Sequence, residues 1–144
     1  MSSATPIPVA SLGANPDVAK EIQNLLLPEY DVVHMCMDGK SAITELPPLC
    51  GGNTATAPSS GLGSNVDREA AERKVPKVVI FGGAVTDDEA KSVSEAVAVL
   101  APQVKMVRVT KDDISAAGSA GPNPEVIVKV LREKLGKLIQ GGEI

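Results

Sequence analysis

A histidine and a cysteine two residues apart are the first feature of this chain that could do chemistry. His34 and Cys36 lie in the apolar stretch 30–38, and side chains two apart on a strand share a face. Such a pair could form an imidazole-activated thiol nucleophile. Ligands of α/β proteins bind beyond the strand ends, however, while mid-strand side chains face the helix layers. We therefore interpret both as core residues and predict no catalytic residue.

Two adjacent acids and a second cysteine are the other candidates for chemistry. Asp87 and Asp88 could act as paired carboxylates, but neighbours on a helix diverge by about 100°. Acids in a first helical turn also complement the helix dipole, which is the role we expect. Cys36 and Cys50 lack the spacing of a zinc or redox motif, so we expect two free thiols and no metal site.

Two glycine-containing turns offer a place for a ligand. Each follows an apolar run, 7–12 or 76–81, and precedes the start of a helical pattern. In open parallel sheets, ligands bind beyond the carboxyl ends of the strands where the winding reverses, and free N–H groups at helix starts suit an anion. The same glycines would also serve a tight turn without any ligand. The candidate ligand-binding residues are Gly13, Ala14, Asn15, Gly82, Gly83, Ala84 and Lys111.

The elements that must position these residues follow from the alternation of apolar runs and helical patterns. We predict strands at 7–12, 30–38, 76–81 and 104–110, and helices at 16–27, 39–46, 86–100 and about 124–140. Strands alternating with helices imply a parallel sheet with right-handed crossovers. The expected fold class is α/β, a three-layer α/β/α sandwich with a four-stranded parallel sheet in the order 2-1-3-4.

Helix boundaries are marked by capping residues and prolines. Asn15 is a good N-cap before a proline, and Thr86 with Glu89 has the spacing of a capping box. Pro47 and Pro48 should end the second helix. The whole chain, 1–144, is expected to form one domain.

Two stretches should lack regular structure. The Gly/Ser-rich and then charged segment at about 50–74 has little to bury and is predicted to be a long mobile loop. Residues 111–122 should form a second loop.

The chain resembles Rossmann-like and flavodoxin-like folds, most nearly a shortened response-regulator receiver. The resemblance rests on the expected sheet order and on two segments, "VASLGANPDVAKEI" and "KVVIFGGAVTDDEA". Receivers carry an acidic pair after the first strand and a phospho-accepting Asp after the third. This chain has Gly13-Ala14-Asn15 and Gly82-Gly83 at those places, so phosphotransfer is not expected.

Known nucleotide fingerprints are incomplete. A dinucleotide site needs G-x-G-x-x-G after the first strand, but the chain offers only Gly13 there, with Asp38 just beyond the second strand. A P-loop motif is lacking as well. Neither a classical NAD site nor a P-loop site is supported, and the cofactor stays open.

Composition argues against polyanions and membranes. The net charge is −4 and aromatic residues make up 1%, so the clustered cations and stacking rings that bind nucleic acid are missing. No stretch approaches the ~18 apolar residues of a membrane span. We expect a cytoplasmic protein.

Self-association is expected through the second strand and helix. Strand 30–38 is an edge with few charges, and helix 39–46 is too short to cover its face, which predicts an apolar patch and a homodimer. Alternatively, the long loop folds back over this patch and keeps the protein monomeric. The candidate interface residues are Val33, Met35, Met37, Ile43 and Leu46.

Three functions fit these features. The leading hypothesis is a small non-catalytic module that binds an anionic or nucleotide-like ligand, or a protein partner. The second is an enzyme or enzyme subunit whose site is completed by another chain or by the 50–74 loop. The third is a structural or assembly protein without a ligand.

Overall fold

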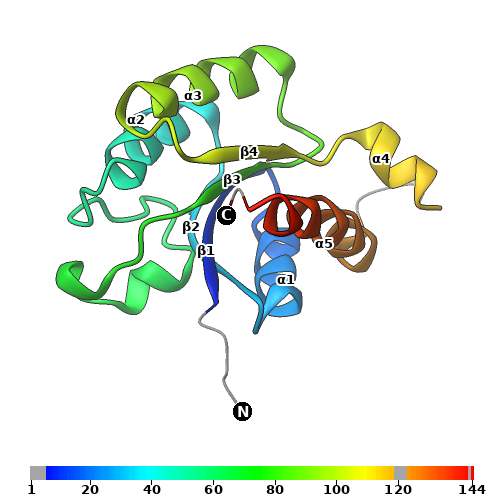
Figure 1. The fold of residues 1–144 in the computed structure, drawn as a ribbon, viewed down its shortest axis with the longest axis horizontal. Coiled ribbons are helices and arrows are strands. Elements are labelled where there is room, and N and C mark those ends of the chain that lie inside the picture. The colour runs from blue at the N-terminus through cyan, green and yellow to red at the C-terminus, as the bar shows by residue number, and fades with distance from the viewer. Residues whose placement is uncertain (1–5, 119–122, 143) are drawn as a thin grey trace.

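A four-stranded parallel sheet forms the centre of the protein (Figure 1). The computed structural model describes residues 6–118, 123–142 and 144. The strands are β1 (Ile7–Leu12), β2 (Tyr30–Cys36), β3 (Val78–Phe81) and β4 (Lys105–Arg108), ordered β2-β1-β3-β4 with all pairs parallel. This confirms the predicted fold class and strand order.

Helices cover both faces of the sheet, as right-handed crossovers require. On one face α1 (Pro16–Leu26) packs against α5 (Pro124–Gln140), and on the other α2 (Gly39–Cys50) packs against α3 (Asp87–Leu100). Each face has its own cluster of buried aliphatic side chains. Within the part of the chain that is described, none of the helices has both the length and the apolar character needed to cross a membrane.

The predicted helix starts are confirmed at atomic detail. The Asn15 side chain accepts hydrogen bonds from the amides of Asp17 and Val18 at 3.0 and 3.2 Å. Thr86 and Glu89 form the capping box of α3. These caps depend only on atoms within one turn of each other, and so the local sequence is enough to predict them.

Two helices differ from the prediction. The helix α2 continues through Pro47 and Pro48 to Cys50, because Leu46, Leu49 and Cys50 are buried on that turn and packing outweighs two lost N–H donors. Residues 111–116, expected to be a loop, form the short helix α4 (Lys111–Ala116). Its Thr110 and Asp113 make a second capping box. Residues 117–118 form a turn, and residues 119–122 of that expected loop lie outside the described residues.

A bulge in β2 changes which side chains share a face. Val9 pairs with Val32 but Ala10 pairs with His34, so Val33 is an extra residue on the β2 side. Simple alternation would place Val32 and Met35 on opposite faces, yet both belong to the cluster beneath α1 and α5. Because of the bulge, simple alternation does not give the face of each side chain along the whole of this strand.

The outer edge of β2 is covered by residues 59–65 of the same chain. The Met35 amide donates to the Leu62 carbonyl at 3.2 Å, and the Ser60 hydroxyl donates to the Met35 carbonyl at 2.6 Å. Farther along, the Ser64 hydroxyl donates to Asp31 at 2.6 Å. Every residue of β2 is therefore buried within one chain.

This cover corrects the predicted surface patch. Val33, Met35 and Leu46 are buried, Met37 is half-buried, and Ile43 is 44% exposed. A side chain buried within its own chain cannot form an apolar patch on the surface, so the expected patch is not present as described. The homodimer itself stays a prediction.

The long segment after α2, residues 51–74, is largely irregular but is held by hydrogen bonds. Residues 51–63 contain no helix or strand, as expected, and two short 3-10 turns follow, η1 (Ser64–Asp67) and η2 (Ala70–Glu72). The buried Asn65 joins the two ends of this stretch: its side-chain amide donates to the Lys74 carbonyl and its side-chain oxygen accepts from the Lys74 amide, both at 3.0 Å. Polar side chains thus hold the segment where apolar ones are scarce, and its mobility stays a prediction.

Candidate functional site

A cavity of about 550 Å³ lies at the carboxyl ends of the strands, on the face covered by α1 and α5. Its inner wall is aliphatic and comes from several elements, including Ile22 and Leu26 of α1, Ile80 of β3 and Leu131 of α5. A volume of this size is typical of small-molecule sites. The cavity lies where the order of the strands reverses, which is the usual ligand position in open α/β sheets.

All seven predicted ligand-binding residues line this cavity. They are Gly13, Ala14, Asn15, Gly82, Gly83, Ala84 and Lys111. The two turns meet because β1 and β3 are adjacent in the sheet, and the Gly82 amide donates to the Leu12 carbonyl at 2.9 Å. Lys111 joins them from the first turn of α4. Whether these residues bind a ligand stays a prediction.

Hydrogen-bond donors at the mouth are available, although not where the sequence suggested. The start of α1 has none to spare, because Pro16 lacks an N–H and the next three amides donate to Asn15. Within the described part of the chain, four backbone amides of the turns make no hydrogen bond, and the Lys111 ammonium has no ion-pair partner. These amides belong to Ala14, Asn15, Gly83 and Ala84.

The glycines of these turns are not explained by the shape of the backbone. Gly13, Gly82 and Gly83 do not have the positive φ that favours glycine. A Cβ added at Gly13 would meet nothing within 4 Å, and at Gly83 it would meet Lys111 Cγ and the Val109 carbonyl at an ordinary 3.6 Å. A Cβ would therefore fit at both positions, so the turn alone does not demand glycine there.

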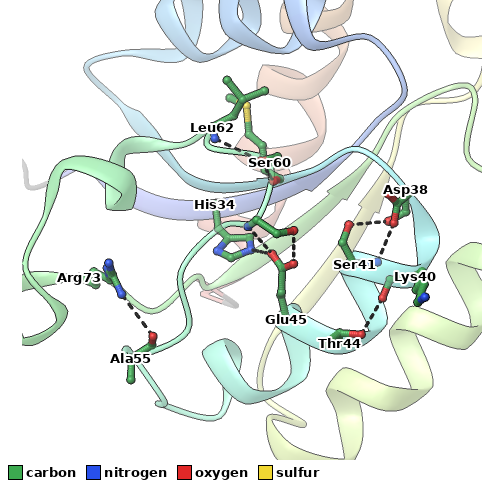
Figure 2. A network of polar contacts seen from close by, with 12 residues as sticks. His34, Asp38, Lys40, Ser41, Thr44, Glu45, Ala55, Ser60, Leu62 and Arg73 are labelled. Carbon is green, nitrogen blue, oxygen red and sulfur yellow. Dashed lines mark hydrogen bonds and ion pairs between the residues drawn. The ribbon is translucent and has the colours of Figure 1, made fainter.

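A second polar group lies on the opposite face of the sheet, between β2 and α2. His34 Nε2 is 2.8 Å from Glu45 Oε1, and the Glu45 carboxylate also accepts from the Ser59 amide at 3.2 Å and the Ser59 hydroxyl at 2.5 Å. Figure 2 shows the His34 ring directed at Glu45. Cys36 lies close by, and one donor atom from each of the three buried residues falls within 4.8 Å of the others.

The chemistry of this group does not favour a nucleophile. Burial raises the pKa of the Cys36 thiol to about 12, so it is protonated at neutral pH. Burial also lowers the pKa of His34, and the hydrogen bond between the ring and the Glu45 carboxylate only partly opposes this. A buried thiol with a raised pKa is inert towards substrates, consistent with our interpretation of both residues as core residues.

Glu45 is the residue that sequence reasoning missed. It lies in an apolar turn of α2 and is 8% exposed. A single carboxylate on the buried face of a helix is a signal that could have been found, because such groups are rarely buried without partners.

Of the two adjacent acids, Asp87 has a side-chain partner. Asp87 Oδ1 accepts from Arg108 Nη1 at 2.5 Å and is exposed, and both Asp87 and Asp88 lie in the first turn of α3. Neither lines the cavity at the strand ends, which supports their interpretation as helix-start residues.

Comparison with protein-family models gave no match, and searches of curated proteins and of solved structures gave none either. The fold and the cavity thus define only a class: a small α/β protein with a parallel sheet and a ligand-sized cavity at the carboxyl ends of its strands.

Proposed function

We propose that the protein is a small-molecule binding module whose ligand has an anionic head and an apolar body. The observation that carries this proposal is the 550 Å³ cavity, which has an aliphatic interior and a mouth of unpaired amides beside Lys111. The head would lie at the two turns, where the glycines let a ligand approach the backbone closely.

The aliphatic wall of the cavity favours a ligand with an apolar body. Among the described lining residues, polar side chains come only from Ser11, Asn15, Lys111 and Ser115. Apolar walls gain free energy by covering apolar ligand surface, at roughly 25 cal/mol per Å². A sugar buried there would lose hydrogen bonds to water without replacement, so an aliphatic or aromatic carboxylate fits better than a phosphosugar.

Binding is favoured over catalysis by the same residues. The described lining includes no His, Cys, Asp or Glu, which leaves Lys111 as its titratable side chain. General acid–base and nucleophilic catalysis need such groups within hydrogen-bond reach of the substrate. An enzymatic role would therefore require further residues, from another chain or from elsewhere in this chain.

A thermal-shift screen tests the proposal. Aliphatic and aromatic carboxylates, nucleotides, dinucleotides and phosphosugars are added at the same concentration, and the carboxylates with apolar bodies are expected to raise Tm most. A ligand present at 100 times its Kd adds about 2.7 kcal/mol of stability. A screen in which no compound raises Tm, or only phosphosugars do, contradicts the proposal.

A substitution that partly fills the cavity tests whether the ligand binds there. Ala19 of α1 lines the cavity, so Ala19→Leu should raise the stability of the free protein by about 0.5–2 kcal/mol and reduce the ligand-induced shift. Ala98 is exposed on α3, on the other face of the sheet, and Ala98→Leu should leave the ligand-induced shift unchanged. Equal shifts in both variants would place the ligand elsewhere.

A further inference from the structure

We propose that His34, Cys36 and Glu45 form a zinc site that joins the edge strand β2 to α2. The site lies on the face of the sheet opposite the cavity, so the inference is independent of the proposed function.

The geometry brings three suitable donors together. One atom each from His34, Cys36 and Glu45 lies within 4.8 Å of the other two, and all three residues are buried. Donors bound to one tetrahedral zinc ion at about 2.0–2.3 Å lie roughly 3.3–3.8 Å apart. Side-chain movements on the order of 1 Å would therefore close the site.

Burial makes these polar side chains costly unless something compensates for them. His34 is 0% exposed and its Nδ1 atom has no hydrogen-bond partner. The hydrogen bond to Glu45 therefore satisfies only one of the two ring nitrogens. Among the ion pairs of the described residues, Glu45 pairs with neither Lys nor Arg. A buried polar atom without a partner is uncommon in native proteins, so the fold alone does not satisfy the His34 ring.

Charge and ligand type favour zinc. Zinc binding would displace the proton of the Cys36 thiol to solvent. The resulting thiolate and the Glu45 carboxylate together carry two negative charges, which one Zn²⁺ ion neutralises in this buried setting. Imidazole nitrogen, thiolate sulfur and carboxylate oxygen are all ordinary zinc ligands, whereas calcium and magnesium prefer oxygen alone. Three protein ligands leave the fourth tetrahedral position to a water molecule.

The ion would also help to fix residues 59–65 over the outer edge of β2. Ser59 donates to Glu45 through its amide and its hydroxyl, and the next residue, Ser60, donates to the Met35 carbonyl of β2. Fixing Glu45 therefore fixes the start of the segment that covers β2.

The test uses the full chain, freed of metal with a chelator and titrated with Co²⁺ and Zn²⁺. Co²⁺ should bind one ion per chain and give a thiolate-to-cobalt charge-transfer band in the near ultraviolet. Cys36→Ser should abolish that band. Cys50→Ser is the matched control, because Cys50 is an equally buried free thiol outside the three-residue group, and it should keep the band.

X-ray absorption of the zinc-loaded wild type needs no variant to fold. It should show one sulfur neighbour at about 2.3 Å and nitrogen or oxygen neighbours at about 2.0 Å. No stoichiometric metal binding by the wild type, a coordination shell without sulfur, or a cobalt band that survives Cys36→Ser overturns the proposal.

Discussion

Asn15 and Asn123 are two residues with the same local role and different surroundings. Each caps a helix that starts with proline and accepts hydrogen bonds from two amides of the first turn. Only Asn15 lines the cavity. Aspartate caps a helix about as well as asparagine, so replacing either residue adds a negative charge with little change in folding.

Asn15→Asp should weaken binding of the best carboxylate from the ligand screen by about tenfold or more, because a like charge then faces the anionic head. Asn123→Asp should bind that carboxylate with wild-type affinity. Dissociation constants from ligand titrations provide the measurement. Equal affinity in both variants would show that the head does not lie at the α1 turn.

His34 and Cys36 should not contribute to the cavity. His34→Gln and Cys36→Ser are expected to bind the same carboxylate as tightly as the wild type, because both side chains lie on the face of the sheet opposite the cavity. Their effect should instead appear in metal binding. Loss of ligand affinity in both folded variants would restore the nucleophile interpretation.

At the scale of single elements, the start of α4 depends on an ionised side chain. The Asp113 carboxylate accepts from the Thr110 amide at 2.9 Å and from Lys134 at 3.0 Å. The hydrogen bond from the Thr110 backbone and then the one from Lys134 hold the pKa of Asp113 below its ordinary value. The stabilisation is therefore complete above the unfolded pKa, about 3.9, and is lost as the pH falls through the lower folded value.

Asp113→Asn should lower the urea midpoint at neutral pH, and its difference from the wild type should shrink below about pH 4. The neighbouring acid Asp112 is exposed and makes no such contacts, so Asp112→Asn serves as the control and should change the midpoint little. A difference that stays constant from pH 7 to pH 3 would show that ionisation of Asp113 is not involved.

The segment over β2 offers a second test of an element. Gly52 and Gly63 have similar φ values of +107° and +109°. A Cβ at Gly52 would meet nothing within 4 Å, whereas at Gly63 it would collide with the Val33 carbonyl. Gly52→Ala should therefore cost about 1–2 kcal/mol of unfolding free energy from conformation alone, and Gly63→Ala should cost more. Equal losses of unfolding free energy for the two variants, measured by urea unfolding, would show that Gly63 does not pack tightly against β2.

For the whole molecule, this contact bears on self-association. A homodimer through β2 now requires residues 59–65 to leave the edge, because they already occupy its hydrogen-bonding groups at Met35. We expect light scattering at micromolar concentration to show more dimer for Gly63→Ala than for Gly52→Ala or the wild type. A wild-type dimer unaffected by either substitution would place the interface elsewhere, and Ile43→Lys would then test the exposed side of α2.

The sheet order and the helix caps could be predicted from the amino-acid sequence because each depends on short-range information. Alternating apolar runs and helical patterns specify strands and helices, and the right-handed crossover then leaves few ways to wind them. The cavity residues followed from the same rule, since the carboxyl ends of adjacent parallel strands must meet.

The remaining features depend on residues that meet only after folding. The bulge at Val33 and the cover of β2 by residues 59–65 are not marked by any local pattern, and α2 runs through two prolines because its last turn is buried. Glu45 reaches His34 across 11 residues of sequence and Ser59 across 14. Contacts of this kind are selected by packing and by pairing of buried polar groups, so the sequence pattern does not reveal them before the chain has folded.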